Sequence, residues 1–136
     1  MADVDVKYHE DFDEAKRKMS LAVQQCLEIV GQSAVTFARD LTPVDTGRLK
    51  NSMTFVTRES TGGHTYSDDH GKTYDGTLSV GADVGEVWFG TNVEYANYIE
   101  NGTSKRGGKH MIKRAVDDHK SYYKAIMERY LASALK

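Results

Sequence analysis

The sequence predicts an α+β fold in which helices pack on one face of a small antiparallel sheet. Apolar residues recur every three or four positions over residues 10–41 and again from Lys109 onward, which is typical of amphipathic helices. Short segments rich in β-branched and aromatic residues lie between these two patterns. A chain of 136 residues with 39% hydrophobic content can bury one core, so we expect a single domain over residues 1–136.

The first expected element is a helix over residues 10–41. Its apolar stripe consists of Phe12, Ala15, Met19, Ala22, Cys26, Val30, Ser33, Phe37 and Leu41. Gly31 weakens the middle of this pattern, so two shorter helices broken near Gly31 are the alternative. A single helix of about 30 residues spans roughly 45 Å, which is long for a small core. We therefore expect it to overhang the sheet and to pack partly on a neighbouring subunit.

The middle of the chain predicts a sheet of about three strands. Pro43 ends the first helix by Leu41, because proline lacks a backbone N–H and disfavours helix in the residue before it. Residues 46–51 predict one helical turn. The three strands are expected over residues 52–58, 77–81 and 86–90, and the last two, joined by a turn at 82–85, are expected to pair antiparallel.

Residues 59–76, between the first two strands, are rich in Gly, Ser, Thr and Asp. We interpret this segment as a long loop or an irregular hairpin tip, since structureless loops of this length are uncommon in compact domains. Such a composition favours disorder in the isolated subunit and ordering by a neighbour. Tyr66 and Tyr74 are then the candidate interface anchors.

Two helices are expected to end the chain. Residues 93–100 predict a short helix that stops at Gly102, because glycine commonly follows the last helical residue. Apolar pairs from Lys109 to the C-terminus predict one further amphipathic helix. We expect both to pack on the same face of the sheet as the first helix.

Composition excludes several classes of protein. A net charge of −2 gives no overall basic field of the kind that attracts nucleic acid. The single cysteine, Cys26, allows no internal disulfide, and its place on the apolar stripe predicts a core position. The acidic N-terminus lacks the apolar run of a signal peptide, and no segment reaches transmembrane length, so we expect no membrane partner.

Asp45-Thr46-Gly47 matches the signature of aspartic proteases, in which two aspartates share a proton. In those enzymes the aspartate lies in a strand-flanked loop of an almost all-β chain, whereas here it follows a long helix and precedes Arg48. Residues 102–110 resemble a phosphate-binding loop, but the glycine-to-lysine spacing and the hydroxyl are wrong and a helix precedes the loop. We therefore keep the protease only as an alternative and reject nucleotide binding.

A second candidate for chemistry is a cluster of potential metal ligands: His64, Asp68, Asp69 and His70. These residues lie in the glycine-rich segment, where no pattern predicts that they are held together. A solvated loop is the simpler interpretation. We expect no catalytic residue, no metal and no cofactor.

The two ends of the sequence carry opposite charge. The C-terminal half contains a basic patch that includes Lys105, Arg106 and Lys109, and the N-terminus contains an acidic patch that includes Asp11, Asp13 and Glu14. Two solvated ends are the ordinary interpretation of such charge runs. The alternative is complementarity between neighbouring copies, or with an acidic partner or passing DNA.

Taken together, two separated stretches are similar to the minor structural proteins of the neck of long-tailed bacteriophages, also called tail-completion or head–tail joining proteins. The positions that carry the resemblance are Pro43, Asp45, Thr46, Gly47, Arg48, Leu49, Gly90, Thr91, Asn92, Tyr95, Ala96, Glu100, Gly102 and Thr103. The resemblance runs from the first helix to about Val116. The segment 59–76 is not part of the shared pattern.

This resemblance implies a non-enzymatic virion protein made in the host bacterial cytoplasm. Copies would form a homo-oligomeric ring of six at the junction between the capsid portal and the tail tube. Its partners would be other neck and tail proteins, and phage DNA would pass through the centre without specific binding. A tail terminator that caps the tail tube is a second interpretation, and a cytosolic adaptor unrelated to virions is a third.

Overall fold

The computed structural model describes residues 2–43, 47–60, 63–105 and 107–134, with side chains from residue 13 onward. Its elements are α1 (Ala2–Asp40), α2 (Arg48–Ser52), β1 (Thr54–Thr57), β2 (Thr65–Ser67), β3 (Thr73–Asp75), β4 (Val87–Gly90), α3 (Ala96–Asn101), α4 (Met111–Asp117) and α5 (Lys120–Ala134). The fold is α+β, as the sequence predicts.

Helix α1 is one continuous helix of 39 residues, about 58 Å long. It confirms the helix predicted over residues 10–41, begins eight residues earlier, and excludes a break at Gly31. A β-carbon at Gly31 would lie 2.6 Å from the Phe55 ring and 2.9 Å from a methyl group of Val87. Glycine therefore serves a close approach between α1 and the sheet.

Two separate two-stranded antiparallel sheets replace the single sheet expected from the sequence. Strand β1 pairs with β4, with Phe55 opposite Phe89 and Val56 opposite Trp88. These strands confirm the predictions over 52–58 and 86–90 with narrower bounds. Strands β2 and β3 form a hairpin within residues 59–76, with Tyr66 opposite Tyr74.

The strand predicted over residues 77–81 is wrong, and so is its pairing with residues 86–90. These residues have no regular structure. The Asn92 side-chain amide donates to the carbonyl groups of Asp75 at 2.9 Å and Thr77 at 3.4 Å. The backbone at the start of this segment is thus bonded to a side chain, and β4 pairs with β1 instead.

The C-terminal helix predicted from Lys109 is confirmed in type but is interrupted, because α4 ends at Asp117 and α5 begins at Lys120. The amide of His119 bonds to the Val116 carbonyl, and the Tyr123 hydroxyl donates to the Ala115 carbonyl at 2.5 Å. Tyr123 thereby satisfies an acceptor that a continuous helix would satisfy itself. His119 stacks on Phe37 of α1, with ring centroids 3.6 Å apart.

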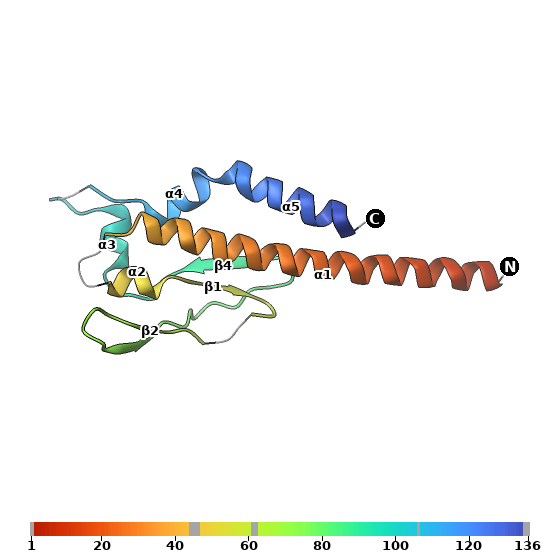
Figure 1. Ribbon diagram of the computed structural model, residues 1–136, viewed down its shortest axis with the longest axis horizontal. Coiled ribbons are helices and arrows are strands. Elements are labelled where there is room, and N and C mark those ends of the chain that lie inside the picture. The colour runs from red at the N-terminus through yellow and green to blue at the C-terminus, as the bar shows by residue number, and fades with distance from the viewer. Residues whose placement is uncertain (1, 44–46, 61–62, 106, 135–136) are drawn as a thin grey trace.

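The elements form layers around α1 (Figure 1). One side of α1 covers the β1–β4 sheet, and the other side packs against α4 and α5. The β2–β3 hairpin lies on the side of the sheet away from α5, where β2 contacts α2 (Figure 1). The N-terminal part of α1 extends past the ends of both α5 and the sheet (Figure 1).

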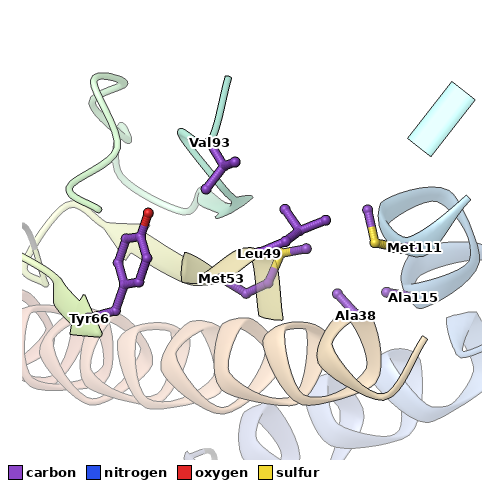
Figure 2. Packing of buried hydrophobic residues seen from close by; sticks show 7 residues of the cluster. All are labelled: Ala38, Leu49, Met53, Tyr66, Val93, Met111 and Ala115. Carbon is purple, nitrogen blue, oxygen red and sulfur yellow. The ribbon is translucent and has the colours of Figure 1, made fainter. Parts of the chain in front are cut away.

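The core lies where the C-terminal end of α1 meets the short elements. Figure 2 shows its buried cluster: Ala38, Leu49, Met53, Tyr66, Val93, Met111 and Ala115. Each large apolar side chain buried there contributes about 1.5–3 kcal/mol. Cys26 is buried elsewhere along α1, and burial raises the pKa of its thiol, as expected of a core residue.

Candidate functional site

The two sequence stretches that stand out, around residues 47–49 and 90–103, meet at one end of the fold. Arg48 of α2 and Glu94, just before α3, form two parallel hydrogen bonds of 2.9 Å each, Nη1 to Oε1 and Nη2 to Oε2. The Arg48 guanidinium also lies 4.4 Å from the ring centre of Tyr74 and 5.6 Å from that of Tyr95. We call Arg48, Tyr74, Glu94 and Tyr95 the arginine cluster.

The charges of the arginine cluster stabilise each other. The bonds with Glu94, and then a bond with the Tyr66 hydroxyl, raise the pKa of Arg48. The bonds with Arg48 lower the pKa of Glu94. Bidentate pairs of this kind fix orientation as well as charge. Arg48 therefore holds together the segment before α3 and strand β3 of the hairpin.

A chain of hydroxyl groups joins the same two stretches beside this cluster. Ser52 donates to the Leu49 carbonyl at 2.6 Å, so its single proton is used and it accepts from the Thr91 hydroxyl at 2.5 Å. Thr91 in turn accepts the backbone N–H of Val93 at 3.1 Å. Each hydroxyl proton thus has one acceptor, which fixes the end of β4 against the end of α2.

Further contacts from residues of the same two stretches hold the hairpin in place. Asn92 bonds to the backbone at the end of β3, and the Asn51 amide donates to the Ser67 carbonyl of β2 at 2.9 Å. Gly47 has a φ of +74°, and a β-carbon at this position would clash with the Asp69 carboxylate. The left-handed backbone and this close approach both require glycine at position 47.

Glu100 fastens α4 to α3. Its carboxylate accepts the backbone N–H groups of Ile112 at 2.8 Å and Lys113 at 3.0 Å, in the first turn of α4. Its own backbone carbonyl accepts the N–H of His110 at 3.0 Å. The carboxylate thus satisfies donors that a helix N-terminus leaves without partners, and its charge suits the helix dipole.

The remaining motif residues occupy structural positions around these contacts. Several lie at element ends: Pro43 follows α1, Gly90 ends β4 and Ala96 begins α3. Leu49 is buried in the core. Gly102 follows α3 with a φ of +86°, and the Thr103 hydroxyl accepts the N–H of Lys105. Asp45 and Thr46 lie outside the described residues. Asp45 is flanked by the helices α1 and α2, whereas the aspartate of an aspartic protease lies in a strand-flanked loop.

Tyr66 and Tyr74 lie on the paired strands of the hairpin. Tyr66 is only 6% exposed and belongs to the core, so its side chain contacts its own chain. Tyr74 stacks on Tyr66 with ring centroids 5.3 Å apart. Within the segment predicted to be disordered in the free subunit, residues 65–75 therefore form a hairpin that contacts the arginine cluster through Tyr74.

The candidate metal ligands in this hairpin serve its turn instead. Asp68 accepts the backbone N–H groups of His70 at 2.9 Å and Lys72 at 3.0 Å and the Tyr74 hydroxyl at 3.1 Å. Desolvation raises the pKa of Asp68, but the backbone donors of Lys72 and His70 outweigh it and leave the pKa lowered. Among the described residues, no three His, Cys, Asp or Glu side chains are grouped to hold a metal ion.

The described residues of the two charge patches lie on separate elements, the loop after α3 and the N-terminal half of α1. The loop joining α3 to α4, which carries exposed Lys105 and Lys109, projects at one tip, and α1 begins at the other (Figure 1). Asp13 and Glu14 are exposed on the N-terminal half of α1. Arg106 and the side chain of Asp11 lie outside the described residues. The loop after α3 and the N-terminal part of α1 lie at opposite ends of the described structure (Figure 1).

Sequence reasoning missed three contacts of this site. Glu94 lies within the second of the two stretches, but nothing in the sequence connects it to Arg48. Asn51 and the capping role of Glu100 were also missed. Glu100 lies twelve positions before Ile112, whose amide it accepts, and such a contact leaves no periodic signal in a sequence.

Comparison with known proteins supplies the family. Residues 7–102 match a family model described as "Bacteriophage HK97-gp10, putative tail-component". No curated protein and no solved structure matches the chain. Among the described residues, no helix has both the length and the apolar character needed to cross a membrane. Because the family model covers more than half of the sequence, the chain belongs to the HK97-gp10-like family of bacteriophage tail components.

Proposed function

We propose that this protein is a non-enzymatic structural part of the virion at the head–tail junction. One domain of 136 residues forms the subunit, and six copies form a ring that joins the tail tube to the portal or connector. Membership of a family of phage tail components is the observation that carries the proposal. Other neck and tail proteins are then its direct partners.

The form of the subunit supports ring assembly. It carries exposed lysines in the loop between α3 and α4 and the exposed carboxylates Asp13 and Glu14 on α1, so two unlike surfaces lie on separate elements. Contacts between unlike surfaces repeat from copy to copy and close into a ring when the rotation allows. The N-terminal part of α1 extends past α5 and the sheet, where a neighbouring copy can pack against it (Figure 1).

The charge of the subunit suits passage of DNA through the ring. A strongly basic channel would bind phosphates through released counterions and would hold the DNA. The net charge of this chain is −2, so the subunit has no overall basic field that would hold DNA in the ring.

Electron microscopy of the purified protein, alone and mixed with tails that lack it, tests the proposal. We expect rings with a central opening, and rings seated on the upper end of the tails. A protein that stays monomeric at all concentrations and leaves tails undecorated would contradict it. The Asp45→Asn variant distinguishes the structural role from the protease alternative. Rings that persist in this variant support a structural role, whereas loss of peptide cleavage by a folded variant would support the enzyme.

A further inference from the structure

Strand β4 leaves one of its two edges open. It pairs with β1 on one side only. In an antiparallel pair every second residue points its backbone N–H and C=O away from the partner, and the described residues give these groups of β4 no further hydrogen bond. Such an edge is a template for another strand, and natural sequences commonly protect it with charged residues or proline. The sequence of β4, Val-Trp-Phe-Gly, contains neither.

A large aromatic side chain is exposed beside this open edge. A β-carbon at Gly31 would lie 2.9 Å from a methyl group of Val87, so Val87 faces α1. Successive side chains of a strand point to opposite faces, so Trp88 points away from α1. Trp88 is 47% exposed there, although an aromatic side chain of this size gains much from burial. The open edge of β4 therefore combines unpaired backbone groups with apolar surface.

A second segment of the same chain also has unpaired backbone groups. Residues 78–82 have no regular structure, and within the described part of the chain their backbone N–H and C=O groups form no hydrogen bond. Ser79, Val80 and Gly81 are exposed. Leu78 and Val80 alternate with Ser79, as apolar and polar residues do in a strand. Paired as a strand, residues 78–82 would span roughly 16 Å, enough to cover the roughly 13 Å of β4.

Within one chain this segment does not pair with β4. Thr77, Leu78, Val80 and Gly81 line a cavity of about 130 Å³ together with residues 54–56 of β1. The segment therefore lies beside β1, and the Asn92 amide holds its start at the Thr77 carbonyl. Each chain thus carries one open strand edge and, separately, one unpaired segment of strand composition.

We propose that residues 78–82 of one copy pair as a strand with the open edge of β4 of the next copy. This inference rests on the proposed ring and names one of its contacts. A second copy is the occupant because each chain supplies both an open edge and an unpaired segment, and a contact between two unlike surfaces repeats from copy to copy around a ring. Main-chain hydrogen bonds provide the affinity, and the added strand covers Trp88.

The fluorescence of Trp88 tests the contact directly, because Trp88 is the single tryptophan of the chain. Its emission should move to shorter wavelength, and its quenching by acrylamide should fall, when dilute monomer is concentrated into rings. Unchanged emission and quenching across assembly would overturn the inference. A change produced by adding another tail protein to the monomer, without self-assembly, would overturn the choice of a second copy.

Proline variants test whether the contact is a strand. Ser79→Pro and Val80→Pro change adjacent residues, so one of them removes an N–H that points to the neighbouring β4, whereas neither N–H has a partner in the described single chain. We expect at least one of them to raise the apparent dissociation constant of the ring about tenfold or more, with the monomer still folded by circular dichroism.

Val84→Pro provides the matched control for these variants. Val84 is 70% exposed and precedes Gly85, whose φ is +80°, in a turn that the N–H of Glu86 closes by donating to the Asp83 carbonyl. Proline suits the residue before such a glycine, so Val84→Pro should leave assembly within about twofold of wild type. If Ser79→Pro and Val80→Pro both assemble as well as Val84→Pro, measured by sedimentation, the inference is overturned.

Hydrogen exchange of the wild-type protein distinguishes pairing between copies from pairing within one chain. The amides of residues 78–82 should exchange rapidly in dilute monomer, and alternate ones should become protected in rings. Equal protection at every protein concentration would overturn the inference, because it indicates pairing within one chain. Rings without new protection here would also overturn it and leave the proposed function intact. A protein that forms no rings and leaves tails undecorated contradicts the proposed function and, with it, this contact.

Discussion

Arg48 and Glu94 lie 46 residues apart in the chain and are joined by two hydrogen bonds of 2.9 Å. The pair connects the corner after α1 with the segment before α3. Glu94 is exposed, and exposed ion pairs by themselves contribute little to stability. The contribution of Arg48 comes from geometry, since the same guanidinium also covers Tyr74 of the hairpin.

Replacement of Arg48 should therefore cost more stability than replacement of Glu94. Arg48→Lys keeps the charge but loses the planar fork and its stacking on Tyr74, so we expect a lower melting temperature than in Glu94→Gln protein. Thermal melts of both variants at pH 7 provide the measurement. If Arg48→Lys melts at the wild-type temperature, the cluster does not position the hairpin.

The same pair predicts a dependence of stability on acidity. Bonding to Arg48 lowers the pKa of Glu94, so this carboxylate stabilises the fold above its unfolded pKa, about 4.3. The stabilisation is lost as the pH falls from that value through the lower folded pKa. Melting temperatures measured between pH 6 and pH 3 should fall more steeply for wild type than for Glu94→Gln protein. Parallel curves would contradict the linkage.

Two adjacent glycines provide a matched test of the α3–α4 junction. A β-carbon at Gly108 would lie 2.4 Å from the Glu100 carbonyl oxygen, whereas one at Gly107 would have nothing within 4 Å. We expect Gly108→Ala to destabilise the fold by about 1–3 kcal/mol, because backbone must shift to admit the methyl group. Gly107→Ala should be within about 0.5 kcal/mol of wild type. Urea denaturation of both variants decides the matter.

Loss of the helix cap at Glu100 should be equally visible. Glu100→Ala leaves two amide groups of α4 without their acceptor, at a cost of about 0.5–2 kcal/mol. Glu100→Gln retains one acceptor oxygen and should fall between Glu100→Ala and wild type. Glu128→Ala, which removes only an exposed pair with Lys124 on α5, is the control. Chemical denaturation gives the ranking, and equal stability of Glu100→Ala and Glu128→Ala would argue against the cap.

Long periodic helices could be predicted from the sequence, whereas the pairing of strands and the side-chain hydrogen bonds between elements could not. The stripe of α1 and the burial of Cys26 follow from helical spacing over many turns. Residues 77–81 have the composition of a strand, but whether such a short segment pairs depends on which groups bond to its backbone. Here the Asn92 side chain bonds to the carbonyls of Asp75 and Thr77. Short apolar runs carry no information on that choice.

The candidate site shows the same division. The turn role of Gly47 could be inferred from its residue type, because few other residues accept its backbone conformation. The partners of Arg48 and Glu100 could not, because each contact depends on packing between elements far apart in sequence. The polar composition of residues 59–76 predicts Tyr66 at an interface. In the structure Tyr66 pairs with Tyr74 in the hairpin, and its side chain is buried in the core.

Ring assembly should depend on salt. In the proposed ring, an exposed ion pair between the basic loop and the acidic helix would contribute about 1 kcal/mol or less, and physiological salt screens such pairs over roughly 8 Å. Several such pairs per interface, repeated around the ring, would bias register and association rate while apolar contacts supply affinity. Replacement of Lys105, Arg106 and Lys109 by Glu should therefore slow assembly most at low salt, with the monomer still folded.

Charge reversal on the other side completes this test. Replacement of Asp11, Asp13 and Glu14 by Lys should restore assembly of the first triple variant when both sets are combined in one chain, because each interface again joins unlike charges. Native mass spectrometry across a salt series measures the ring population, and circular dichroism confirms the fold of each variant. Unchanged ring populations in the first triple variant would eliminate this pairing and assign the basic loop to DNA, to another neck protein or to solvent.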